Sequence, residues 1–272
     1  MGGDLLEAFV SEAGPLAAEA ADRVVKAVPE LEGVRGCVEA LILSKALNYL
    51  VWGVEDGRPP TPRDAVRHAA STVLEGADVV RVLCRLFKAV SLRLAARASG
   101  GGVATLLDVG CGCGAALAAV ASYCPAPAPA AVGLDMSYGM LEVLRVLRPD
   151  ALPVHGVADA IPLRDSSVDE LITTYSIHEF PSLKAFMAEV VRVLKPGGRA
   201  LIVDRFSTPL TRLVSAAGRA VRLTFGKAPE NPYGLDEVVE SAEGAGLEVI
   251  RAWRVGGGLR SFLGVVELVK PP

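Results

Sequence analysis

The chain has 272 residues, 51% of them hydrophobic, and a formal net charge of −3 at pH 7. This length suffices for one large domain or for a core domain with an appendage, and the apolar content excludes a disordered chain. Tight nucleic-acid binders usually carry a basic excess or a basic stripe, so the charge disfavours an RNA substrate without excluding it.

Two sequence features bear on membranes and secretion. Acidic residues stand near the start, where a secretion signal needs basic ones, so we expect a cytoplasmic protein. The stretch 111–134 carries no charge, but glycines and prolines interrupt it. We therefore expect a turn between two elements there and no membrane span.

The five cysteines are irregularly spaced, which predicts neither a CxxC pair nor a disulfide framework. Cys37 and Cys84 fall in helical patterns, where we expect buried, hydrophobic side chains. Cys111 and Cys113 are close together, but no second Cys or His pair completes a tetrahedral site. No metal is expected.

The first third of the chain, residues 1–98, has a helical pattern. Thr61 followed by Pro62 predicts an N-cap with proline at the first helical position. Apolar residues at three- and four-residue spacing predict an amphipathic helix over 79–94. Its basic residues are expected to face solvent, with an RNA-binding face as the alternative: Arg81, Arg85, Lys88 and Arg93.

Beyond the glycine-rich segment Ser99–Gly102 short apolar runs alternate with helical patterns, which indicates βαβ units and a largely parallel, doubly wound α/β sheet. The predicted strands are 104–109, 131–135, 152–157, 168–174 and 199–204. The predicted helices between them are 114–123, 137–147 and 182–194. Lys195–Gly198 predicts a type II turn before the fifth strand.

The C-terminal part predicts helices at 208–224 and 235–245, separated by a loop rich in glycine and proline. Two strands at 247–254 and 260–269 follow, joined by a glycine run, and this pattern is typical of a hairpin. The last strand of the sheet is therefore expected to be antiparallel.

The sequence LLDVGCGCG, ending at Gly114, predicts a strand that runs into a glycine-rich turn and a helix. Glycines let the backbone approach a ligand closely, but the same spacing also fits a dinucleotide-binding loop. Asp108 stands where a dinucleotide fold keeps an apolar residue, and a carboxylate there suits an ammonium or sulfonium group. Asp135 ends the second strand, where an acid can accept ribose hydroxyls; a helix N-cap is the alternative.

These segments resemble, in order and spacing, the motifs of the class I S-adenosylmethionine-dependent methyltransferases: LLDVGCGCG, VGLDMSYGML, PLRDSSVDELITTYSIHEF and LKPGGRALIVD. The resemblance covers roughly residues 103–205 and is nearest to the branch that methylates small molecules, including quinone precursors. It implies a Rossmann-like, mostly parallel sheet with an antiparallel last strand, in a cofactor-binding domain at 99–272. The helical region 1–98 departs from that branch and is expected to be a lid or a substrate-binding extension.

The resemblance also implies roles for single residues. Asp108 matches the acid near the methionine amino group, and Gly110, Cys111 and Gly112 match the loop around the methionyl part and ribose. Asp135 matches the acid that holds the ribose hydroxyls. Met136 corresponds to the residue that packs on the adenine.

Contacts to the adenine edge are expected before Pro162, where family members often have an acid followed by an alanine. One alignment places this pair at Val157 and Ala158, and a shorter loop places it at Asp159 and Ala160. We favour Asp159.

Residues after the fourth strand match the catalytic face of the family. Thr174 and Tyr175 are expected beside the cofactor, and His178 is the candidate general base because histidine titrates near neutrality. Glu179 is expected to orient His178 or to accept the proton itself. The alternative is that His178 only shapes the loop.

The acceptor site is predicted from residues in three parts of the chain: Tyr49 and Trp52 in the helical region, Asp204 and Arg205 at the end of the fifth strand, and Phe225 and Tyr233 in the covering loop. The predicted function is transfer of a methyl group from S-adenosylmethionine to a small, hydrophobic or aromatic metabolite, with S-adenosylhomocysteine as product. The alternatives are an RNA methyltransferase, a nicotinamide-dependent oxidoreductase, and a module that binds S-adenosylmethionine without turnover.

Overall fold

The structure is a computed structural model that describes residues 3–101, 103–124, 129–208, 233–257 and 261–272. The chain divides into two compact units, Met1–Gly156 and Val157–Pro272. The first unit therefore combines the helical region with the first strands that follow it. The boundary expected near residue 98 separates two sequence patterns and stays a prediction.

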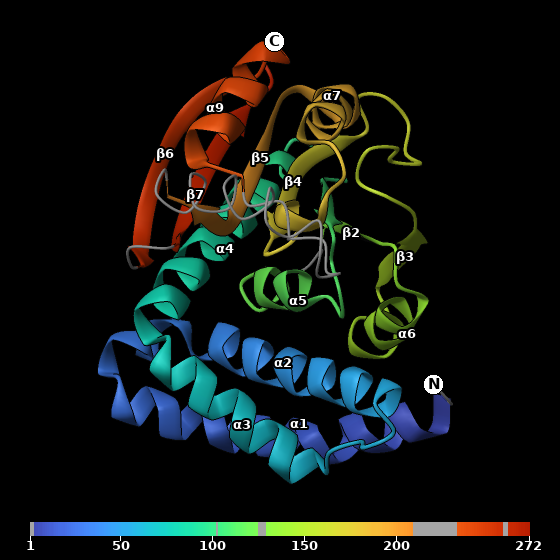
Figure 1. Ribbon diagram of the computed structural model, residues 1–272, viewed down its shortest axis with the longest axis vertical. Helices are drawn as coiled ribbons and strands as arrows, with labels where there is room; N and C mark the ends of the chain where they lie inside the picture. The colour runs from blue at the N-terminus through green and yellow to red at the C-terminus, as the bar shows by residue number, and fades with distance from the viewer. Residues whose placement is uncertain (1–2, 102, 125–128, 209–232, 258–260) are drawn as a thin grey trace, which may run out of the picture. The chain divides into compact units, whose positions relative to one another are not determined.

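The helical pattern of the first third is confirmed. Its helices are α1 (Gly3–Ala27), η1 (Pro29–Val34), α2 (Arg35–Glu55), α3 (Pro62–Glu75) and α4 (Ala77–Ala98). Helices α1, α2 and α3 lie side by side (Figure 1). The N-cap expected at Thr61 is present, because its hydroxyl accepts a hydrogen bond from the Asp64 N–H at 3.2 Å.

The amphipathic helix expected over 79–94 is α4, whose apolar stripe is buried. The expectation for the cysteines is only half right. Cys37 on α2 and Cys84 on α4 are both fully buried, but they are joined by a disulfide bond. Residues that are 47 positions apart give no local signal of pairing, which is why their irregular spacing suggested none.

By length and composition alone, the helical stretch Pro29–Val54 is apolar enough to cross a membrane. In the first unit this stretch packs against α1, α3 and helix α5 (Ala115–Ala121). Of its most apolar window, 44% is buried, and a core helix of a globular protein has the same composition.

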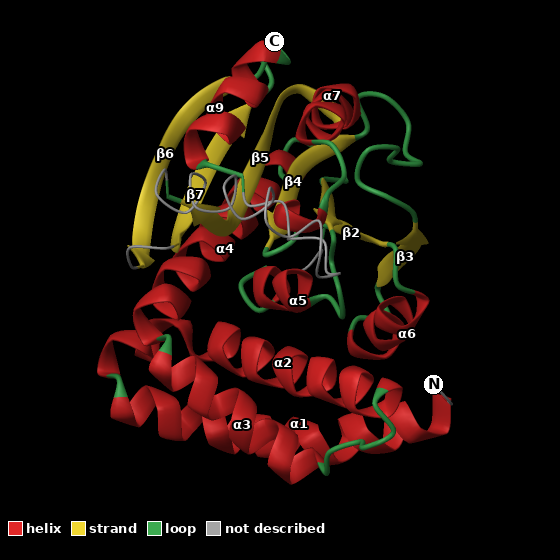
Figure 2. Cartoon of the chain, viewed as in Figure 1, coloured by secondary structure: helices red, strands yellow, loops and turns green. Residues whose placement is uncertain are grey.

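The first unit also holds three parallel strands in the order β3-β2-β1: β1 (Thr105–Val109), β2 (Ala130–Asp135) and β3 (Ala151–His155). Helix α5 follows β1, and α6 (Tyr138–Leu147) follows β2. Helix α2 contacts both of them, so the helical region packs directly on the helices of the βαβ units (Figure 2). Parallel strands end at the same edge of a sheet, which brings the ends of β1 and β2 together.

The second unit contains β4 (Val168–Thr174), η2 (Ile177–Glu179), α7 (Leu183–Val193), β5 (Leu194–Ser207), α9 (Leu235–Gly244), β6 (Glu248–Gly257) and β7 (Ser261–Val269). Its strand order is β4-β5-β7-β6. Strands β4 and β5 are parallel, whereas β7 runs antiparallel to both β5 and β6. The α/β class, the mostly parallel strands and the antiparallel last strand are therefore confirmed.

One predicted boundary is wrong. The turn expected at Lys195–Gly198 belongs to β5, which begins at Leu194 instead of near residue 199. Its backbone pairs with the C-terminal segment, because the Gly197 N–H donates to the Lys270 carbonyl at 2.8 Å and the Lys270 N–H donates to Gly198 at 2.9 Å. Gly197 keeps the positive φ, 71°, of a type II turn. The helix expected at 208–224 lies outside the described residues from 209 onward.

Candidate functional site

Asp108, near the end of β1, is the most unusual side chain of the first unit. It is 1% exposed, and neither carboxylate oxygen has a hydrogen-bond partner among the described residues. Burial and, to a smaller extent, the negative charge of Asp135 together raise the pKa of Asp108 to about 8. An orphaned buried carboxylate is costly, so the position suits a ligand that brings a positive charge and N–H donors.

The glycine-rich turn after β1 forms the wall beside this carboxylate. Gly112 has φ +52°, and a Cβ atom there would meet nothing within 4 Å, so a ligand can approach its backbone. Gly114 has φ +85°, and its Cβ would lie 2.4 Å from Leu144 Cδ1. The first glycine leaves space for a ligand, and the second lets α6 pack closely against the turn.

Asp135 connects this turn to the end of β2. One carboxylate oxygen accepts from the Gly112 N–H at 2.8 Å, and the other accepts from the Ser137 N–H at 2.8 Å. The N-cap of α6 is Ser137, whose hydroxyl accepts from the Met140 N–H at 3.4 Å. Asp135 is therefore held by backbone donors, and each of its oxygens keeps a lone pair for ligand hydroxyls.

Met136 and Cys111, both expected beside the cofactor, differ in exposure. Met136 is 70% exposed and offers an apolar surface beyond β2. Next to it, the Tyr138 and His155 rings stack at 3.9 Å, and His155 Nε2 lies 3.0 Å from the Met136 carbonyl oxygen. Cys111 is buried, and this burial raises the pKa of its thiol, so it contributes packing and backbone instead of a reactive sulfur.

The helical region borders the glycine-rich turn through α2. Cys113 Sγ donates to the Ser44 carbonyl at 3.2 Å. One turn further along α2, the Tyr49 ring lies 6.0 Å from Trp52 and 4.7 Å from His68 on α3. The two aromatic residues predicted to contact the acceptor thus form one cluster, and Trp52 is 50% exposed.

In the second unit the structure pairs His178 with Asp204 instead of its neighbour Glu179. His178 Nδ1 lies 2.9 Å from Asp204 Oδ1, and the His178 N–H donates to the other carboxylate oxygen at 3.4 Å. Asp204 is fully buried and also accepts from the Arg205 N–H at 2.6 Å, whereas Glu179 is exposed. A carboxylate enclosed in this way orients an imidazole and has no exposed surface, so the structure does not support the direct substrate contact expected of Asp204.

This pairing depends on the second unit's topology. His178 follows β4 and Asp204 lies near the end of β5, and these strands are parallel neighbours. The sequence predicted where both strands end, but not which residues of the two strands pair with each other. The sequence signal that could have revealed the pairing was the common edge at which neighbouring parallel strands end.

Backbone strain marks the segment between β4 and His178. Tyr175 has φ +55°, which is unusual for a residue other than glycine, and its N–H donates to the Val203 carbonyl at 2.8 Å. Its side chain is 43% exposed, while Thr174 at the end of β4 is half-buried. Such strain concentrates at functional sites, where surrounding contacts hold it in place.

The remaining predicted residues of the second unit lie in separate segments. Ala158 is buried, Asp159 half-buried and Ala160 exposed, in a turn closed by a bridge between Val157 and Ala160. The Tyr233 hydroxyl donates to the Phe180 carbonyl at 3.0 Å.

Two further acceptor-site candidates stay predictions. Arg205 has an exposed side chain at the end of β5, and Phe225 lies outside the described residues.

Comparison with known proteins agrees with this arrangement. Residues 107–202 match a family model described as a methyltransferase domain. Over 127 residues the chain is 34% identical to a demethylmenaquinone methyltransferase of Renibacterium salmoninarum, covering 45% of this chain and 50% of the relative. The chain spans about half the length of the curated relatives it matches.

Two solved structures share the fold. A candidate sarcosine dimethylglycine methyltransferase from Galdieria sulphuraria gives a TM-score of 0.54 at 17% identity, covering 84% of this chain and 98% of that one. The [4+2]-cyclase SpnF gives a TM-score of 0.51 at 18% identity, covering 69% and 81%. The family match over residues 107–202 and the shared fold agree with the resemblance of the sequence motifs to class I methyltransferases.

Proposed function

We propose that the protein is an S-adenosylmethionine-dependent methyltransferase that acts on a small molecule in the cytoplasm and releases S-adenosylhomocysteine. The observation that carries this proposal is the buried carboxylate of Asp108, which has no hydrogen-bond partner in the described ranges of the chain. A dinucleotide places its anionic pyrophosphate beside the glycine-rich loop, whereas the methionine part of S-adenosylmethionine carries an ammonium group.

The residues of the first unit fit this cofactor. Asp108 would hold the amino group, the open side of Gly112 would border the ribose, and Asp135 would accept the ribose hydroxyls. Met136 would cover one face of the adenine. When bound, the cofactor supplies a methyl group on a positively charged sulfur, which a nucleophile can attack in line.

His178 and Asp204 supply the acid–base chemistry. Asp204 accepts from His178 Nδ1, which leaves Nε2 as the proton acceptor of a neutral imidazole. His178 Nε2 would take the proton that the acceptor's nucleophilic atom loses. An acceptor that ionises by itself would need only alignment and exclusion of water.

The acceptor class is supported by the relative's name and by the aromatic residues. Demethylmenaquinone, named for the Renibacterium relative, is an aromatic small molecule. The cluster of Tyr49, Trp52 and His68 offers partly exposed rings on which a planar ring can stack. We therefore favour an aromatic or quinone-like acceptor.

Calorimetric titration with S-adenosylhomocysteine and, separately, with NAD tests the cofactor. Tight binding of the first with no binding of the second is expected. Transfer of labelled methyl from S-adenosylmethionine to a panel of phenols, quinols and amines then tests turnover. Binding of NAD alone would overturn the proposal, and cofactor binding without transfer to any of these acceptors would favour a non-catalytic module.

A further inference from the structure

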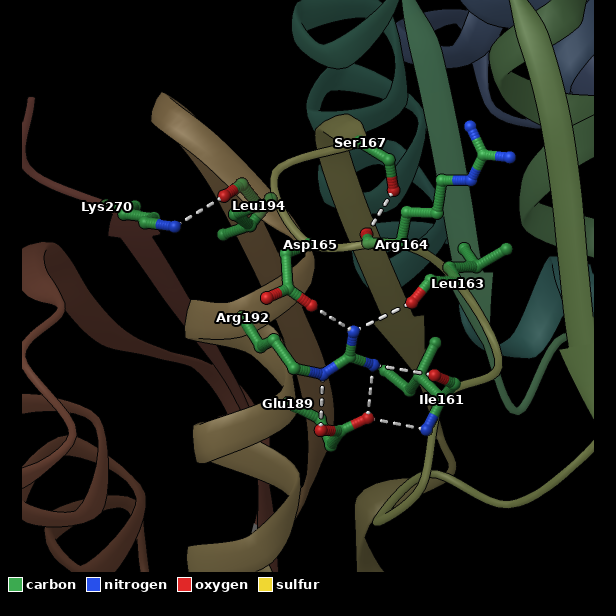
Figure 3. A network of polar contacts seen from close by, with 9 residues as sticks. All are labelled: Ile161, Leu163, Arg164, Asp165, Ser167, Glu189, Arg192, Leu194 and Lys270. Atoms are coloured by element: carbon green, nitrogen blue, oxygen red, sulfur yellow. Dashed lines mark hydrogen bonds and ion pairs between the residues drawn. The ribbon is translucent and has the colours of Figure 1, made fainter.

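The loop before β4 shows polar groups that the chain pairs internally. Arg192 on α7 donates from Nη2 to the Ile161 carbonyl and from Nη1 to the Leu163 carbonyl, each at 2.7 Å (Figure 3). A carboxylate oxygen of Glu189 accepts from the Ile161 N–H at 2.6 Å. Groups that are paired in this way need no ligand. Buried polar atoms that lack a partner are the informative ones.

Six buried side-chain oxygens have no hydrogen-bond partner among the described residues, and four of them belong to Ser44, Asn48 and Asp108 of the first unit. The other two are the Tyr123 hydroxyl after α5 and Thr173 Oγ1 in β4. Ser44 is as fully buried as Asp108. An orphaned buried group costs free energy, so a cluster of such groups indicates a ligand that pairs with them.

Cys113, in the glycine-rich turn, shows that Ser44 and Asp108 are neighbours. Its Sγ donates to the Ser44 carbonyl at 3.2 Å. Burial raises the pKa of the Cys113 thiol to about 12, while the Ser44 hydroxyl lowers this pKa and the charge of Asp108 raises it. Both groups therefore lie near the same sulfur, yet neither has a hydrogen-bond partner in the described part of the chain.

Asn48 lies one turn after Ser44, on the same face of α2. Val51, the next residue on this face, reaches the start of α6, because a Cβ at Gly139 would lie 3.8 Å from Val51 Cγ1. Helix α2 contacts both α5 and α6. The face that carries Asn48 thus borders the first unit between its contact with Cys113 and its contact with α6.

We propose that Ser44 and Asn48 bind the amino-acid end of the cofactor together with Asp108, which makes the helical region part of the cofactor site. This inference rests on the proposed function. The amino-acid end has an ammonium group, which only donates, and a carboxylate, which only accepts. Asp108 and the Asn48 side-chain carbonyl can accept from the ammonium group, and the Ser44 hydroxyl can donate to the carboxylate. All three residues belong to the first unit.

The test compares two ligands that share the adenosine and the thioether sulfur. S-adenosylhomocysteine has the amino-acid end, and 5′-methylthioadenosine lacks it. The full chain is expected to bind the first at least about 100-fold more tightly, since each hydrogen bond to a charged group contributes about tenfold or more. Ser44→Ala and Asn48→Leu should each lower this ratio by about tenfold and leave the affinity for 5′-methylthioadenosine unchanged.

Ser91→Ala is the matched control. Ser91 is another fully buried serine of the helical region, on α4, but its hydroxyl lies 3.2 Å from Cys124 Sγ and so has a partner. Its ligand ratio should stay at the wild-type value. Without ligand, Ser91→Ala should lower the melting temperature, whereas Ser44→Ala should not, because it removes a hydroxyl that pairs with nothing in the described part of the chain.

Each outcome has a distinct meaning. An unchanged ratio in both Ser44→Ala and Asn48→Leu overturns the inference, and so does an equal loss of affinity for the two ligands. An unchanged ratio in one variant removes that residue from the subsite. If Asp108→Asn alone lowers the ratio, the proposed function stands and this inference fails. If the wild-type chain binds neither ligand, the proposed function itself fails. Should Asn48→Leu fail to fold, Asn48→Ala carries the same comparison.

Discussion

Asp108 combines two properties that rarely occur together: a side chain that is only 1% exposed and a carboxylate without a hydrogen-bond partner in the described part of the chain. With a pKa of about 8 it is protonated at neutral pH in the free protein. A bound ammonium group would need it ionised, because only the carboxylate compensates the cation. Ligand binding and proton release are therefore linked at this residue.

We predict that Asp108→Asn weakens binding of S-adenosylhomocysteine by about 10- to 100-fold, the usual worth of a hydrogen bond between charged groups. In the wild type the affinity should rise with pH, by up to about tenfold per unit below pH 8, as Asp108 loses its proton. The slope should be absent in Asp108→Asn. Calorimetry in buffers of different ionisation enthalpy measures the released proton, and a wild type that releases none would contradict the assignment.

The same carboxyl affects stability in the free protein. Its pKa is raised from 3.8 to about 8, so between these values the native state binds a proton that the unfolded state has released. Stability is therefore highest below pH 4 for this group alone and falls as the pH rises towards 8, by a few kcal/mol at most. Urea unfolding at pH 5.5 and 7.5 should show this loss in the wild type and a smaller loss in Asp108→Asn.

His178 and Asp204 allow a second prediction at this scale. Asp204→Asn should remove the charge that orients the imidazole and lower kcat by about 100-fold, within the usual range for acid–base catalysis, with little change in the KM for S-adenosylmethionine. His178→Ala should lose at least as much. Nitrogen NMR should show the proton on Nδ1 in the wild type. A larger loss from Glu179→Gln than from Asp204→Asn would assign the orienting role to Glu179 instead.

Among the elements, α2 connects the most parts of the first unit. It contacts α1 and α3 on one side and the helices α5 and α6 of the βαβ units on the other, and the disulfide from Cys37 joins it to α4. The helical region therefore shares a core with the glycine-rich turn after β1. Disulfides are rare in the cytosol except in hyperthermophiles. This bond therefore argues against the proposed cytoplasmic location unless the source is a hyperthermophile.

We predict that a count of reactive thiols will detect the disulfide and that its removal will lower the stability of the protein. In denaturant without reductant, three of the five cysteines should react with a thiol reagent, since Cys111, Cys113 and Cys124 are free. Replacing Cys37 and Cys84 by alanine should lower the free energy of unfolding by up to about 4 kcal/mol, because the bond closes a long loop in the unfolded chain. Reductant should destabilise the wild type and leave the double variant unchanged. Five reactive thiols would exclude the bond.

The order of secondary structure was predictable because it depends on local periodicity. Strand β4 begins and ends where the pattern of 168–174 placed it, and α7 at Leu183–Val193 differs from its expected bounds by one residue at each end. The turn before β5 was misplaced because Gly197 and Gly198 pair with Lys270, 72 residues or more further along the chain. A turn signal in the sequence contains no information about such a partner.

At the scale of the whole molecule, the net charge disfavours RNA as a substrate. The net charge is −3, and Arg81 on the basic face of α4 is already paired with Asp78 at 2.8 Å. The shared fold does not decide the chemistry, since a [4+2]-cyclase has it as well. The acceptor has to be argued from the site.

We predict no appreciable binding of short single-stranded RNA at about 50 mM salt and no steep change towards 200 mM, because few phosphates would be neutralised. Fluorescence anisotropy with a labelled RNA measures both. Tight binding with a steep salt dependence would support the RNA alternative, and loss of that binding on replacing Arg85 and Lys88 would locate it on α4.

The sequence by itself determined the βαβ order, the glycine-rich turn, and the acids at the ends of β1 and β2, because each is encoded within a few neighbouring residues. Only the tertiary structure decided the partners: Asp204 for His178 and the Ile161 backbone for Arg192. It also left the carboxylate of Asp108 without a hydrogen-bond partner among the residues that the structure describes. Partners depend on strand register and on the packing of distant segments, and burial then decides whether a carboxylate is a solvated surface group or a site that needs a ligand.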